Sequence, residues 1–248
     1  MSKDKLLHNK NTISIKYKGI DINVNLIYRK RKNITIQIKP NYEVSIISPL
    51  GVPKKLLKNF LIEKSDWILK KFDEYKEVEH IYKEKEFVDN EKYMYLGKEY
   101  NLKIIIDENE EVFIDNDLLI VRVKNTEKEY IKNKLKLWYK KESERIVIER
   151  LVYCREHCSM MMRLIPSKLK VKEQKKRGGT CTSKRSIYIN SKISMARKEA
   201  IDYILIHEFS HLVHMNHSKD FYSLVKQMMP NYKEQEKWLK ENSYKLKL

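Results

Sequence analysis

The sequence predicts an α+β protein, in which an N-terminal, mostly antiparallel β module with a packed helix precedes an α+β domain with a histidine-rich helix near its C-terminus. Two patterns support this fold class. Apolar and polar residues alternate through residues 12–48, the period of a strand with one buried face. From residue 126 onward, apolar residues recur mainly at helical spacing. The chain has 248 residues, 42% of them hydrophobic, which is enough for two regions, expected at 1–125 and 126–248.

The first region should open with a small sheet. The alternating runs in residues 12–48 are separated by Gly19, by the basic cluster Tyr28–Lys32 and by Pro40, which predicts antiparallel strands with the basic cluster as a charged hairpin turn. In residues 53–75 the apolar positions change to helical spacing. One helix, straight or kinked, should therefore pack on this sheet.

Further elements follow from the same two periods. Residues 76–92 are polar and aperiodic, which is typical of a connector. A glycine-bearing loop, 177–186, should lie between two short strands and form part of a hairpin beside the histidine-rich helix; the alternative is that Gly178 and Gly179 simply make a turn. Ser194 and Ser218 are candidate N-caps for the last helices. The expected strands are 93–96, 100–106, 111–114, 118–123, 169–171 and 187–189, and the expected long helix is 126–158.

The composition constrains partners and location. A formal charge of +18, from 52 Lys and Arg against 34 Asp and Glu, would suit a polyanion, but lysine is spread along every segment, so nucleic acid is not the favoured partner. No apolar run is long enough to span a membrane, and residues 1–8 lack a hydrophobic signal core. We therefore expect a cytoplasmic protein without a membrane partner. Three cysteines, Cys154, Cys158 and Cys181, are an odd number that argues against a disulfide framework.

The motif most informative about function is His207-Glu208-Phe209-Ser210-His211. Positions i and i+4 share one helical face, so His207 and His211 can bind a single zinc ion. Glu208 lies about 100° around the helix, where its carboxylate can act as general base on a zinc-activated water. The pattern predicts a zinc-dependent hydrolase of peptide or amide bonds, with one Zn²⁺ as cofactor and a peptide or protein as substrate.

A third protein ligand is needed, since catalytic zinc usually has three and one open position. His214 is disfavoured, because it would lie roughly 10 Å along the helix axis from His207. His217 can return to the ion if the helix ends near residues 213–216, and it is the ligand that we expect. Glu234 and Glu236, on a later helix, are the competing candidates.

The segment from His207 to Leu212, with Asn216-His217-Ser218 and Phe221 after it, resembles the signature of the YgjP-like family of predicted zinc metallopeptidases. Upstream, Arg177-Gly178-Gly179-Thr180-Cys181 is similar to the family's Arg-Trp-Gly-Ser-Cys motif, with Gly178 in place of Trp and Thr180 in place of Ser. The resemblance implies a zincin-like catalytic domain with His207, His211 and His217 as ligands and Glu208 as catalyst. It does not supply the substrate.

The sequence leaves the roles of some residues, and the substrate class, open. Arg177, Tyr222 and His214 are candidates for contacts to the substrate or to the developing oxyanion. One rival interpretation keeps the chemistry but recruits the peptidase to nucleic acid, as in SprT-like proteases. The other is a non-catalytic binding protein that zinc merely stabilises.

Overall fold

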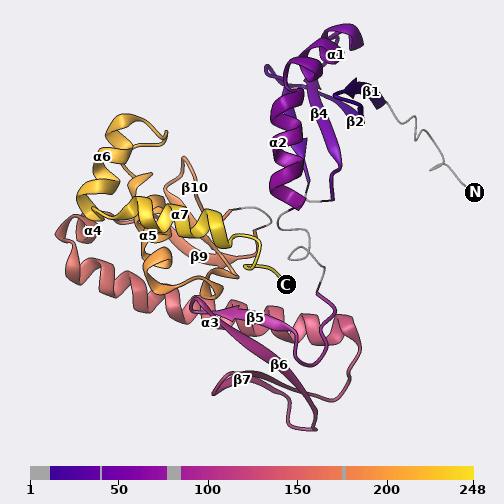
Figure 1. Ribbon diagram of the computed structural model, residues 1–248. Coiled ribbons are helices and arrows are strands. Elements are labelled where there is room, and N and C mark those ends of the chain that lie inside the picture. The colour runs from indigo at the N-terminus through magenta and orange to yellow at the C-terminus, as the bar shows by residue number, and fades with distance from the viewer. Residues whose placement is uncertain (1–11, 40, 77–84, 175–176) are drawn as a thin grey trace, which may run out of the picture. The chain divides into compact units, whose positions relative to one another are not determined.

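A computed structural model describes residues 12–39, 41–76, 85–174 and 177–248 of the chain (Figure 1). The described residues form α-helices and three small sheets of mixed strand direction, which confirms the α+β class. The chain divides into two compact units, Met1–Lys83 and Glu84–Leu248. None of the helices in the described ranges has both the length and the hydrophobicity to cross a membrane.

The first unit is a four-stranded sheet with two helices packed on it. The strand order is β1-β2-β4-β3, with antiparallel outer pairs and a parallel central pair, β2 with β4. Helix α2 begins directly after Lys64, so the single kinked helix of the sequence prediction is two helices. The bounds are β1 Thr12–Tyr17, β2 Ile20–Arg29, β3 Thr35–Ile38, β4 Val44–Pro49, α1 Lys54–Glu63 and α2 Ser65–Lys76.

The sequence predicts a hairpin turn at the basic cluster Tyr28–Lys32, but the structure has no hairpin there. Tyr28 and Arg29 end β2, and the chain then passes to β3 on the far side of β4. Strands adjacent in sequence are therefore not adjacent in the sheet. The alternating pattern predicts strands and their buried faces, but it does not predict which strands pair.

The second unit opens with a sheet of the same topology. Its order is β5-β6-β8-β7, again with a parallel central pair, β6 with β8. The first hairpin of each sheet turns through two residues of positive φ, Lys18 (48°) and Gly19 (79°) in one, Leu96 (46°) and Gly97 (82°) in the other. This is the turn whose twist matches that of a hairpin. The bounds are β5 Lys92–Tyr95, β6 Lys98–Ile106, β7 Glu111–Asp115 and β8 Leu118–Val123.

The sequence predicts a boundary between residues 125 and 126, whereas in the structure the β5–β8 sheet shares a core with the long helix α3, Lys128–His157. Leu102 and Val121 from the sheet pack in one buried cluster with Leu135 and Tyr139 from the helix. A sheet with one apolar face has to bury that face, and here α3 covers it. The contacts place the division between the units at residues 83 and 84 instead.

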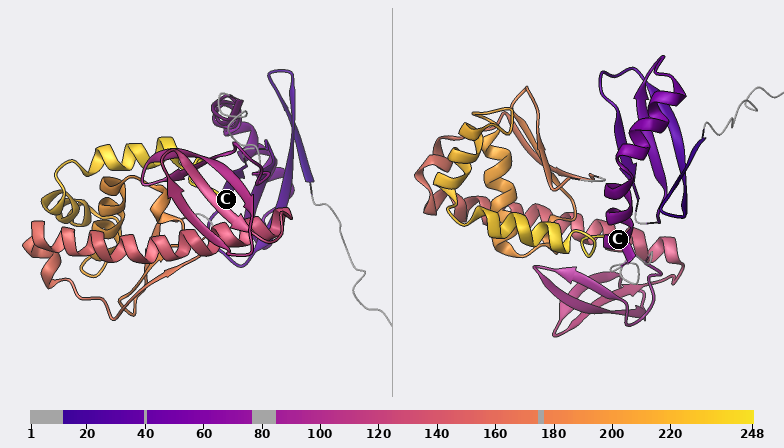
Figure 2. Two further views of the ribbon diagram at one scale, coloured as in Figure 1. Left: turned by 90° about the horizontal axis from the view of Figure 1, so that it is seen from below. Right: turned by 45° about the horizontal axis from the view of Figure 1, so that its top comes forward.

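Helix α3 connects the parts of the second unit (Figure 2). Its N-terminal half packs on the β5–β8 sheet, and its C-terminal half packs in the cluster that contains the later helices. The remaining elements are α4 Ser159–Arg163, β9 Lys168–Lys172, β10 Gly179–Cys181, β11 Ser186–Asn190, the short 3₁₀ helix η2 Ile193–Met195, α5 Lys198–Ser210, α6 Lys219–Met228 and α7 Tyr232–Asn242. Strands β9–β11 form a sheet of order β10-β11-β9, which leaves β10 at an edge.

Buried polar contacts fix α5 against α3. The Arg150 guanidinium donates two hydrogen bonds, of 2.7 and 2.6 Å, to the Asp202 carboxylate, and both side chains are buried. Ser194, expected as the N-cap of α5, lies instead in η2, where its backbone N–H donates to Ser143 Oγ. Arg197 is the N-cap residue of α5, without a side-chain cap. Two-point recognition of a carboxylate fixes orientation as well as distance, so it sets the rotation of α5.

Candidate metal centre and active site

Helix α5 carries the first two histidines and is buried on almost every side. Ten of its thirteen residues are buried, and it contacts α3, α6, α7 and β10. The run from Tyr203 to Ile206 places apolar side chains on every side of one turn, which is typical of a helix buried in a core. The helix is therefore a rigid support for the side chains of its last turn.

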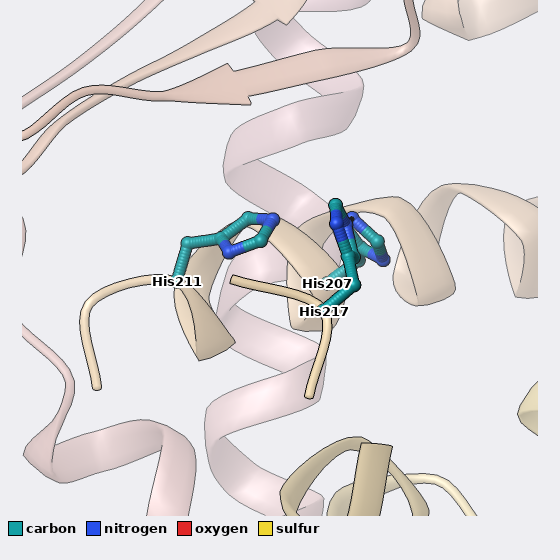
Figure 3. Close-up of side chains that lie close together, drawn as sticks. All are labelled: His207, His211 and His217. Atoms are coloured by element: carbon teal, nitrogen blue, oxygen red, sulfur yellow. Dashed lines mark hydrogen bonds between the residues drawn. The ribbon is translucent and has the colours of Figure 1, made fainter. Parts of the chain in front are cut away.

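His207, His211 and His217 converge at the C-terminal end of α5 (Figure 3). His207 is in the last turn, His211 is the C-cap residue, and His217 comes from the loop before α6. Their candidate ligand atoms all lie within 4.8 Å of one another, and Nε2 of His207 is 3.1 Å from Nε2 of His217. Tetrahedral zinc with bonds of about 2.1 Å separates its ligand atoms by roughly 3.4 Å. Small side-chain adjustments would thus accommodate the ion.

The loop between His211 and His217 brings the third ring back to the helix. The α-helix ends at Ser210, and hydrogen bonds from the backbone N–H groups of Val213 and His214 to the Ser210 carbonyl continue as a turn. Asn216 does not have a positive φ in this turn. Ser218 then caps α6 as expected, with its hydroxyl accepting from the backbone N–H of Phe221 at 3.3 Å.

The protonation of the cluster suits metal binding. His211 Nδ1 lies 2.9 Å from the His214 carbonyl, which can only accept, so Nδ1 carries the proton and Nε2 is free for a ligand. Burial, and then the neighbouring rings of His211 and His217, lower the pKa of His207 to about 4. Burial also lowers the pKa of His211. Nδ1 of His207 is buried without a hydrogen-bond partner, and neutral imidazoles gathered in this way are the donor set that zinc takes.

Phe221 supports all three rings, a role that its place on the apolar face of α6 did not reveal. Its side chain is fully buried, and its ring centroid lies 5.0, 4.5 and 4.9 Å from those of His207, His211 and His217. The His211 ring stacks on it, and the other two meet it edge to face. Phe221 therefore restricts the histidine rotamers from one side.

Glu208 is buried in contact with the edge strand β10. Burial raises the pKa of its carboxyl group to about 7, against smaller opposing effects from a backbone hydrogen bond of Cys181 and the positive charge of Arg177. A Cβ atom at Gly179 would lie 2.5 Å from Glu208 Cγ and 2.8 Å from its Oε1. A side chain at Gly179 would therefore clash with the Glu208 carboxylate, which explains the glycine at this position. Neither Gly178 nor Gly179 has the positive φ of a tight turn, so the two glycines do not simply make a turn. The hairpin turns at Arg185, with φ of 59°.

The other predicted site residues differ in their positions. Arg177 is exposed, but its charge acts on the Glu208 carboxyl group. The Tyr222 ring centroid is 6.1 Å from that of His217, with an angle of 33° between the ring planes. His214 contributes its backbone carbonyl to His211, and its side chain is outside the histidine cluster. Glu234 and Glu236 are exposed on α7 and do not belong to the cluster either.

A family model described as YgjP-like, metallopeptidase domain, matches residues 32–242. A comparison of the sequence with curated proteins finds no match. The match covers most of the chain, including the helix with the two histidines and the loop with the third.

Proposed function

Since the chain belongs to the YgjP-like family of metallopeptidase domains, we propose that it is a zinc-dependent peptidase in which His207, His211 and His217 hold the ion and Glu208 is the general base. The observation that carries the proposal is the convergence of three imidazoles at the end of the helix whose last turn also carries the buried Glu208. Three nitrogen ligands suit zinc and leave a fourth position for water or substrate. When bound, zinc would polarise the substrate carbonyl and lower the pKa of water.

Glu208 suits the role of proton carrier. A general base works best when its pKa lies near the operating pH, and burial raises that of Glu208 to about 7. The carboxylate can take a proton from the attacking water and pass it to the leaving amine. The backbone hydrogen bond of Cys181 and the close approach of Gly179 hold the carboxylate in one position while it does so.

We further propose that the substrate is an extended peptide that pairs with β10. This strand is hydrogen-bonded to β11 on one side and is the edge of its sheet. It also packs on α5 and meets Glu208 through Gly179. A peptide added at an edge strand gains main-chain hydrogen bonds with little demand on its sequence. Its scissile carbonyl would then lie beside the catalytic carboxylate.

The decisive experiment replaces Glu208 by Gln in the full-length protein. Hydrolysis of a quenched fluorescent peptide mixture should fall by at least about 10³-fold, while zinc content, measured by mass spectrometry, stays at one ion per chain. His217→Ala should instead lose the ion. If the wild type binds zinc and cleaves no peptide under any condition tested, the non-catalytic alternative holds.

His217→Ala also has a matched control, His214→Ala, because the His214 side chain is outside the cluster. The backbone carbonyl of His214, which lies 2.9 Å from His211 Nδ1, is retained on substitution. Zinc affinity should therefore change little in the control. Equal zinc affinity in both variants would remove His217 from the ligand set.

A further inference from the structure

A lysine-lined cavity of about 540 Å³ lies in the second unit, away from the histidine cluster. Helix α3 forms one wall, and the end of β9 with residues 191–192 forms another. The peptidase chemistry makes no use of it. Its lining includes Leu248 and the charged side chains of five lysines and one glutamate: Lys132, Lys136, Lys140, Lys172, Lys192 and Glu173. We call these five lysines and their cavity the lysine pocket.

The pocket is built on rigid elements. Lys132, Lys136 and Lys140 are four residues apart on α3, so they project from one face at intervals of about 6 Å. On the opposite wall, the Ser191 backbone N–H donates to the Lys172 carbonyl at 3.0 Å. The Ser191 carbonyl in turn accepts from Ser143 Oγ of α3, also at 3.0 Å. These hydrogen bonds fix both walls relative to each other.

Two of the five lysines pair with acidic residues outside the lining. Lys132 pairs with Glu129 at 3.0 Å, and Lys140 is 3.9 Å from Glu144. No ion pair within the described residues involves Lys136, Lys172 or Lys192. The Lys172 ammonium instead lies 3.7 Å from the centroid of the Tyr188 ring.

The two walls also repel each other electrostatically. Lys192 is half-buried, and burial lowers its pKa; Glu173 opposes this effect, and the nearby charge of Lys136 adds to it. Partly desolvated like charges held together by backbone hydrogen bonds cost free energy in the empty protein. An anion between them would recover this cost.

We propose that the lysine pocket binds a compact anion with several linked phosphate groups, such as an oligophosphate or the phosphate chain of a nucleotide. A phosphate group carries up to about two negative charges and offers several acceptor oxygens, so a short chain can match four or five ammonium groups. The volume is in the range of ligand pockets, roughly 300–1,000 Å³. The lining has no aromatic ring on which a base could stack and no arginine, so it recognises charge rather than a base.

The test is titration calorimetry of the full chain with sodium tripolyphosphate, ATP, sulfate and a single-stranded DNA oligonucleotide. The variant K136E/K192E should weaken binding of tripolyphosphate about tenfold or more, because two attractive contacts become repulsive. The matched control is K226E/K233E, which changes the net charge equally on the exposed surfaces of α6 and α7. The affinity of this control for tripolyphosphate should stay within about twofold of that of the wild type. Tripolyphosphate can chelate zinc equally in both variants, so chelation does not account for a difference between them.

A second variant, K136Q/K172Q, keeps the test valid if K136E/K192E does not fold, as judged by its melting curve. ATP bound as tightly as tripolyphosphate would identify the phosphate chain as the recognised group, and tighter ATP binding would identify a nucleotide as its source. Equal affinity for tripolyphosphate in wild type and folded pocket variants would overturn the proposal. So would tripolyphosphate binding no tighter than sulfate, or binding confined to the oligonucleotide.

Discussion

The contact between Gly179 and Glu208 gives a prediction that separates catalysis from folding and from metal binding. The change is Gly179→Ala, which adds one methyl group. Its carbon would lie 2.5 Å from Glu208 Cγ and 2.8 Å from Cδ, whereas ordinary contacts begin at 3.4 Å. The carboxylate or the strand must therefore move by about 0.9 Å, the difference between 3.4 and 2.5 Å. The backbone at Gly179 does not have a positive φ, so the substitution adds no strain of that kind.

A displacement of about 1 Å at a catalytic group can lower the rate about 10²-fold, which corresponds to about 2.7 kcal/mol in the activation free energy. We expect this loss in kcat for hydrolysis of a quenched fluorescent peptide mixture. Zinc content should stay at that of the wild type, because the three atoms nearest to the new methyl group all belong to Glu208 and none to a histidine. The assay therefore combines peptide turnover with metal analysis of the same sample.

The neighbouring residue offers a matched control. A Cβ at Gly178 would meet the end of the Ile204 side chain, with Cδ1 at 2.8 Å, and a terminal methyl group can rotate away. Gly178→Ala should thus keep activity within about threefold of wild type, a change of under about 1 kcal/mol. Full activity of Gly179→Ala, or an equal loss in both variants, would refute the argument that Gly179 is required by the position of Glu208.

Three other outcomes follow from the same structure. Asp202→Ala leaves the Arg150 guanidinium buried without its carboxylate, and should lower the free energy of unfolding by about 3–5 kcal/mol in urea titrations; a loss below about 1 kcal/mol would contradict a buried pair. Removal of zinc by a chelator should lower the melting temperature of the wild type, and added zinc should restore it, whereas His217→Ala should show neither change. In the metal-free protein, the pKa of His207 is lowered to about 4, so the unfolded chain binds a proton more readily at this residue and the folded state loses stability as the pH falls from 6.5. The pKa of Glu208 is raised to about 7, so the folded state binds a proton more readily at this residue and gains stability over the same range. Glu208→Gln removes the second effect, so this variant should lose more stability than the wild type between pH 6.5 and pH 4.5 in denaturant melts, and parallel curves would contradict these shifts.

Most residues of the candidate site could be predicted from the sequence, because they lie close together along the chain. The offset between His207 and His211 is a property of any helix, and the apolar run before it indicates burial. His217 can reach His207 and His211 because the helix ends before it, at Ser210. Phe221 and Gly179 were not recognised as supports of the site, because each acts through a contact with a distant segment: one with the histidine rings, the other with Glu208.

The strands were predicted more accurately than their assembly. Alternation of apolar residues placed β1 to β8 close to their observed positions, since a half-buried strand needs that period wherever it lies. Pairing was not predictable in the same way. Both four-stranded sheets place a parallel pair at their centre, so the cluster Tyr28–Lys32 connects strands that are not neighbours.

By itself the sequence determined the class of elements and the spacing of His207 and His211 at the end of the helix from Lys198 to Ser210, because these depend on residues within a few turns of one another. Only the tertiary structure decided that the β5–β8 sheet belongs with α3, that Glu208 lies against Gly179, and that five lysines enclose one cavity. Each of these depends on which buried surfaces meet. A chain with several apolar faces can pair them in more than one way until its core is packed.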